Sequence, residues 1–82
     1  MKKKDLLQDW EIVQQEYYEQ FNRSAVERLY IEWFDDNEYP SDMNKDEMIK
    51  ELIESELDFR KDDTIEELKE TIEHIEKLNF NN

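Results

Sequence analysis

Residues 33–47, WFDDNEYPSDMNKDE, decide the fold because they separate two helical halves of the chain. The stretch holds the only proline, Pro40, which biases the preceding Tyr39 away from α conformation. It also holds six carboxylates and a single cation, Lys45. We therefore expect a loop at residues 37–43 with an acidic and aromatic surface, between the end of one helix and the start of another.

Apolar residues recur at intervals of three and four on both sides of this stretch, which is the period of an amphipathic helix. We predict an all-α fold with a single acidic domain at residues 1–82, because a chain this short buries only one small core. It is a small bundle of about four helices, the last two forming a C-terminal helical hairpin, over residues 5–21, 24–36, 44–56 and 64–78. The predicted starts rest on capping residues, namely Ser24 with Glu27, Asn44, and Thr64 with Glu67.

The predicted core takes one stripe from each helix and relies on aromatic side chains. The apolar fraction is 37%, below the roughly 45–50% of a typical globular protein, and the ten aromatics compensate because each can bury about 150–250 Å². Phe59 is expected to fold back into this core from a connector at residues 57–63. A homodimer that completes the thin core stays open as an alternative. The expected core residues are Trp10, Val13, Tyr17, Leu29, Trp33, Leu52, Ile53, Leu68, Ile72 and Ile75.

The composition excludes several classes of protein. Without cysteine there is no disulfide, no thiolate nucleophile and no zinc site built on Cys. Without glycine there is no phosphate-binding loop of the P-loop or Rossmann kind. No window approaches the eighteen or so apolar residues of a membrane span, and the basic start at residues 2–4 lacks the apolar segment of a signal peptide. We expect a cytoplasmic protein that does not contact membranes.

Residues suited to catalysis or metal binding are sparse. We interpret His74, the only histidine, as a surface residue beside Glu70 and Glu73. Carboxylate pairs at glycosidase spacing carry no specificity in a chain with 24 acids. The acidic loops also lack the glycine of an EF-hand. We therefore predict no catalytic residue, no cofactor and no metal.

Residues 44–78 contain NKDEMIKELIES, the connector LDFRKDD and TIEELKETIEHI in that order. This order resembles the helix, extended loop and helix of the HeH and SAP families, whose modules commonly bind DNA. The chain lacks the glycine and the basic residues with which SAP modules meet phosphate, and phosphate contacts need Lys or Arg. The resemblance therefore implies the shape of such a module and no direct binding of nucleic acid.

The strongest functional signal is the net charge of −13, which repels nucleic acid and attracts basic surfaces. In size and charge the chain resembles the small acidic phage inhibitors of the DNA-mimic, anti-restriction, anti-CRISPR and glycosylase-inhibitor kinds. The resemblance implies a non-enzymatic inhibitor that occupies the basic surface of a nucleic-acid-binding protein. The expected partner-binding residues are Glu32, Trp33, Asp35, Asp36, Glu38, Tyr39, Asp42, Asp46, Glu47, Glu51 and Glu54.

Two other functions remain alternatives on the sequence alone. One is an acidic immunity or antitoxin-like protein that neutralises a basic nuclease away from its substrate groove. The other is an intracellular helical scaffold that binds a partner unconnected with nucleic acid, through Tyr18, Tyr30 and Tyr39.

Overall fold

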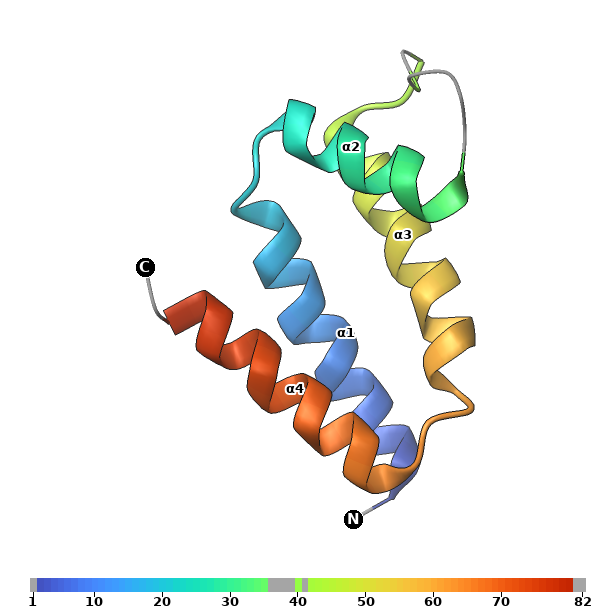
Figure 1. Ribbon diagram of the computed structural model, residues 1–82, viewed down its shortest axis with the longest axis vertical. Coiled ribbons are helices and arrows are strands. Elements are labelled where there is room, and N and C mark those ends of the chain that lie inside the picture. The colour runs from blue at the N-terminus through green and yellow to red at the C-terminus, as the bar shows by residue number, and fades with distance from the viewer. Residues whose placement is uncertain (1, 36–39, 41, 81–82) are drawn as a thin grey trace.

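The computed structural model describes residues 2–35, 40 and 42–80, and within these residues the chain forms four helices and no strand (Figure 1). The all-α bundle predicted from the periodicity is confirmed. In the described part of the chain, none of the helices has the length and apolar character needed to cross a membrane. The four helices are α1 (Lys3–Glu19), α2 (Arg23–Phe34), α3 (Lys45–Arg60) and α4 (Ile65–Phe80).

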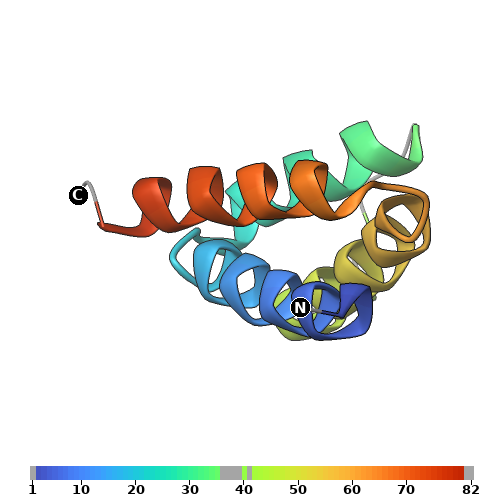
Figure 2. The ribbon, with the colours of Figure 1, turned by 90° about the horizontal axis from the view of Figure 1, so that it is seen from below.

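Helix α1 occupies the centre of the bundle. Helix α4 packs along it, α3 contacts both α1 and α2, and α2 crosses α3 (Figures 1 and 2). The expected C-terminal hairpin is present in that α3 and α4 are joined by the short connection 61–64. Its two arms diverge from this connection, however, and the main packing partner of α4 is α1. The packing of α1 against α4 therefore brings the N-terminal and C-terminal helices together.

Side-chain caps begin three of the helices. Asn44 accepts a hydrogen bond from the Glu47 N–H at 2.8 Å, and Thr64 and Glu67 cap each other's backbone N–H at 3.1 Å, so both predicted caps are confirmed. The predicted cap at Ser24 is wrong. Asn22 accepts from the Ala25 N–H at 2.9 Å instead, so α2 begins one residue earlier than predicted. Asparagine caps as well as serine does, and the earlier start also allows an ion pair between Arg23 and Glu27.

Helix α3 runs four residues beyond its predicted end and absorbs much of the expected connector. Nothing between 57 and 60 breaks a helix, and Arg60 in the last turn favours the helix dipole. This extension carries Phe59 outward, where its side chain is 63% exposed. The prediction that Phe59 folds back into the core is therefore wrong. The segment that was expected to form the extended loop of an HeH-like module is helical as far as Arg60.

The core lies where α1, α3 and α4 meet, with one contribution from α2. Six expected residues are buried there, while Val13, Tyr17 and Leu29 are half-buried against them. Trp33 is 42% exposed, which corrects its assignment to the core: α2 packs mainly on α3, so its last turn has protein on one side and solvent on the other. The core also includes five residues that the predicted set lacks, namely Leu6, Tyr18, Val26, Met48 and Ile49.

Asp35 ends α2 in the left-handed conformation, with φ of 54°. Glycine adopts this conformation without a steric penalty, and a negative charge at a helix C-terminus opposes the dipole. We expect Asp35→Gly to raise the free energy of unfolding by about 0.5–1 kcal/mol, measured by urea denaturation. Asp35→Asn removes the charge alone and should give part of the gain. An Asp35→Ala variant as stable as the glycine variant would contradict this explanation.

Candidate protein-binding surface

Four acids form a line along the outer side of α3. Glu47, Glu51, Glu54 and Asp58 follow one another at intervals of four, three and four residues, and all four are exposed. At 100° per residue they fall within about 60° of the helix circumference, and at 1.5 Å per residue they span about 16 Å. We call these four residues the acidic stripe. Sequence reasoning found its first three members and missed Asp58, which it had assigned to a connector.

The other predicted acids lie at the two ends of the loop that precedes α3. Glu32 and Asp35 are on and just after the last turn of α2, while Asp42 and Asp46 lie close to the start of α3, and all four are exposed. The end of α2 is held beside the stripe because the Tyr30 hydroxyl donates to Glu51 Oε2 at 2.6 Å. Three predicted residues lie outside the described part of the chain, namely Asp36, Glu38 and Tyr39.

These carboxylates are largely uncompensated. Among the residues that the structure describes, only Asp58 of the stripe has an ion pair, an exposed contact of 3.1 Å with Lys61. None of the seven described acids predicted to bind a partner forms an ion pair with a described cation. Their charge therefore faces solvent, where it is available to a basic partner.

Two exposed aromatic side chains lie next to the stripe. The rings of Trp33 and Phe59 meet edge to face, 6.2 Å apart at 87°, and the Trp33 indole N–H donates to Ser55 Oγ at 2.8 Å. The Arg60 guanidinium lies 5.9 Å from the Phe59 ring centroid. Ser55 directly follows Glu54, so this aromatic pair borders the acidic stripe. The sequence predicted Trp33 both as a core residue and as a partner-binding residue. It did not predict Phe59 at the surface, because an apolar residue in an expected connector is usually buried.

A cavity of about 250 Å³ lies beside the aromatic pair and reaches the core. Trp33 and Phe59 contribute to its wall, together with Trp10 from α1 and His74 from α4. Glu56 also lines the cavity, as the only acid among its lining residues. The cavity joins the exposed surface to a polar cluster between α1 and α3.

Glu56 links α1 to α3 through two hydrogen bonds. The Tyr18 hydroxyl donates to its Oε1 at 2.6 Å, and Gln14 Nε2 donates to its Oε2 at 3.1 Å. Burial raises the pKa of Glu56, while the two hydrogen bonds and the nearby Arg60 partly offset that rise. Burial, together with the adjacent Glu56, likewise raises the pKa of Tyr18. Tyr18 is only 5% exposed, which corrects its expected role in a scaffold surface.

The raised pKa of Glu56 predicts a specific pH dependence. The ordinary pKa is 4.5, so the folded protein holds this proton more tightly than the unfolded chain does. The stabilisation is therefore present at low pH and is lost as the pH rises above 4.5 through the folded-state pKa. Glu56→Gln keeps a side-chain oxygen that can accept from Tyr18 but has no titrating carboxyl group, so this pH-dependent loss of stability should be absent in the variant. The free energy of unfolding of the parent minus that of the variant should therefore be larger at pH 4 than at pH 7. Denaturant titration of both proteins at each pH measures this difference.

Glu54→Gln is the matched control because it removes an exposed charge from the same helix. Its effect on stability should change little over the same range. If the difference between the parent and Glu56→Gln were independent of pH, the link between the buried carboxyl and stability would be refuted.

Comparison of the chain with known protein families, curated proteins and solved structures finds no match in any of the three. Within residues 2–35, 40 and 42–80, no group of three or more His, Asp or Glu side chains is arranged to hold a metal ion. The distinctive surface of the described chain combines the acidic stripe, the acids around the start of α3, and the Trp33 and Phe59 pair. Charge and exposed aromatics are the chemistry of protein recognition.

Proposed function

We propose that this chain is a non-enzymatic inhibitor that binds the basic nucleic-acid-binding surface of a target protein, as a DNA mimic does. The acidic stripe is the observation that carries the proposal. It places Glu47, Glu51, Glu54 and Asp58 on one exposed line of a single helix, in a chain with a net charge of −13.

The spacing of the stripe approaches, but does not reach, that of a phosphate backbone. Successive carboxylates are separated by about 4.5–6 Å along the helix axis, whereas each DNA strand places a phosphate about every 3.4 Å of axis. One stripe is therefore less dense than one strand. The exposed acids Asp42 and Asp46 add charge near the start of α3, where the stripe begins at Glu47. Glu32 and Asp35 add charge at the end of α2. Together they present an extended anionic surface to a basic groove.

In a complex, the aromatic pair supplies the buried, well-packed contacts that charge alone does not provide. Long-range attraction speeds association, but the contacts that hold a complex are usually buried, well-packed side chains, with Trp and Tyr prominent among them. Trp33 is already oriented by its hydrogen bond to Ser55, so little conformational freedom is lost when a partner covers it. In the proposed complex the acids steer the target and Trp33 with Phe59 anchor it.

The same aromatic pair supports a second candidate, a binding module whose partner has no connection with nucleic acid. Trp33 and Phe59 are 42% and 63% exposed, so both rings are accessible to a partner. In that case the acids would contribute to solubility and to the rate of association only. An immunity-like inhibitor that binds a nuclease outside its groove is intermediate between the two candidates. A DNA mimic and nucleic acid exclude each other on the target, whereas the immunity-like inhibitor and nucleic acid can bind the target together. The third candidate has a partner that does not bind nucleic acid.

Competition for DNA separates these candidates. The assay follows the anisotropy of a labelled duplex bound to a restriction endonuclease, to a uracil-DNA glycosylase, or to an RNA-guided nuclease, while this chain is added. A DNA mimic releases the duplex from at least one of them, and the release weakens as salt is raised from ~0.01 to ~0.15 M. Binding of this chain to a target without release of the duplex would favour the immunity-like alternative and contradict the mimic. No release from any of the three would also count against it.

A further inference from the structure

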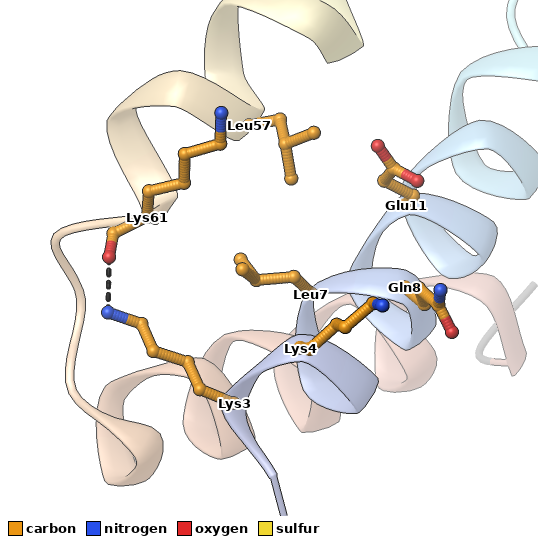
Figure 3. A pocket seen from close by; sticks show the side chains of 7 residues that line it. All are labelled: Lys3, Lys4, Leu7, Gln8, Glu11, Leu57 and Lys61. Carbon is orange, nitrogen blue, oxygen red and sulfur yellow. Dashed lines mark hydrogen bonds between the residues drawn. The ribbon is translucent and has the colours of Figure 1, made fainter.

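A second cavity, of about 280 Å³, lies at the C-terminal end of α3 (Figure 3). The first turns of α1 form one side and the last turn of α3 forms the other. Leu7 and Leu57 face each other across it, one from each helix, and both are half-buried. The cavity therefore has an apolar interior that neither helix covers.

The rim of this cavity is basic, although the protein as a whole is strongly acidic. Three of the chain's eleven cations, Lys3, Lys4 and Lys61, are among the seven residues that line the cavity. Glu11 is the only acid among those seven. The local excess of positive charge thus has the opposite sign to the net charge of −13. Chain topology produces this excess, because the two lysines of α1 and Lys61 are far apart in sequence.

The packing of the two chain segments holds the rim together. Lys3 Nζ donates a hydrogen bond to the carbonyl oxygen of Lys61, the residue that caps the C-terminus of α3 (Figure 3). A lysine at this position also complements the negative end of the helix dipole. Lys61 Nζ forms an ion pair with the exposed Asp58, and such an exposed pair has little energetic value. Each ammonium has three donors, so the rim keeps free donors for an anion.

We infer that this cavity binds a small anionic amphiphile, a carboxylate with a short apolar body such as a medium-chain acyl group. The acyl chain would lie between Leu7 and Leu57, and the carboxylate would lie at the rim, where the positive field of Lys3, Lys4 and Lys61 attracts it. Glu11 and the Lys4 ammonium lie on the side away from Lys3, so the anionic head is placed toward Lys3 and Lys61 (Figure 3). The volume, about 280 Å³, is just below the roughly 300–1,000 Å³ typical of ligand sites, which favours a small ligand.

Matched amphiphiles test the charge that the cavity selects. Decanoate and decyltrimethylammonium carry similar alkyl chains and opposite charges, and both are titrated below their micelle concentrations. Methyl NMR shifts of Leu7 and Leu57 report occupancy, with the exposed Ile12 on α1 as a reference for general adsorption. Decanoate should shift both leucines and leave Ile12 unchanged, while decyltrimethylammonium should bind this site at least about fivefold more weakly. Equal binding of the two probes would overturn the inference.

Two variants with equal net charge then separate the site from the overall field. Lys4→Gln with Lys61→Gln removes two rim cations, whereas Lys69→Gln with Lys77→Gln removes two exposed cations of α4 that do not line the cavity. The first variant should weaken decanoate binding by about five- to tenfold and the second by less than about twofold. Glu11→Gln should tighten it. Equal losses in both double variants would show that only net charge matters and would refute the site.

The remaining occupant to consider is the acidic stripe of a second copy of this chain. It would shift the Leu7 and Leu57 resonances on dilution, without any added probe. Resonances that do not change with protein concentration support a small ligand, and a concentration-dependent shift would assign the cavity to self-association instead. This test is independent of the proposed function, because it uses neither the acidic stripe variants nor a nucleic-acid-binding target.

Discussion

Replacement of Trp10 by alanine is expected to lower the free energy of unfolding by about 3–5 kcal/mol, the usual cost of truncating a large buried aromatic residue. Trp10 is 1% exposed and is the largest fully buried side chain in the described chain. At roughly 0.05–0.15 kcal/mol per residue, a chain of this length has a total stability of about 4–12 kcal/mol. The expected loss is therefore a large fraction of the total stability, as measured by far-ultraviolet circular dichroism during urea denaturation.

The expected loss comes from packing rather than from hydrogen bonding. The Trp10 Nε1 atom is buried and has no hydrogen-bond partner among the described residues. Trp10→Phe should therefore cost less than the alanine variant, because it keeps much of the buried ring and loses no hydrogen bond. Ile12→Ala is the control on the same helix, since Ile12 is 58% exposed and should cost less than about 0.5–1 kcal/mol. Equal losses at positions 10 and 12 would contradict the assigned core.

Neutralising the acidic stripe is expected to have the largest effect on binding. The triple change of Glu47, Glu51 and Glu54 to glutamine removes three exposed charges and keeps the side-chain shapes and the helix. Electrostatic steering raises association rates by about 10- to 1,000-fold. We therefore expect the variant to associate with its target at least about tenfold more slowly at low salt, with a smaller difference at ~0.15 M salt. Stopped-flow measurement on any target that the DNA competition assay identifies gives this rate.

Helix α4 supplies a control with the same geometry. Glu66, Glu70 and Glu73 have the same four-and-three spacing as the stripe residues, and all three are exposed. Changing them to glutamine alters the net charge by the same amount on a different helix. If this control slowed association as much as the stripe variant does, the effect would be due to net charge, and the proposed contact surface would be wrong.

Much of the fold follows from local patterns in the sequence. The intervals of three and four between apolar residues indicate four helices, and Asn44 and Thr64 set two of their starts through side-chain caps that depend on near neighbours only. The direction of the acidic stripe on α3 is also a local property, because helix geometry alone places Glu47, Glu51 and Glu54 on one side. These features could be predicted because each depends on residues within one or two turns.

The tertiary structure decided which apolar and polar residues meet between helices. Trp33 and Tyr18 both follow a helical apolar pattern, yet the first is 42% exposed and the second 5%, because α2 packs mainly on α3 whereas α1 lies at the centre of the bundle. Helix packing likewise brings together residues that are far apart in the chain. Tyr18 and Gln14 donate hydrogen bonds to Glu56, and Lys3 and Lys4 line the same cavity as Lys61. Periodicity fixes the apolar face of each helix, but burial depends on which neighbour covers that face, and helix packing sets this choice.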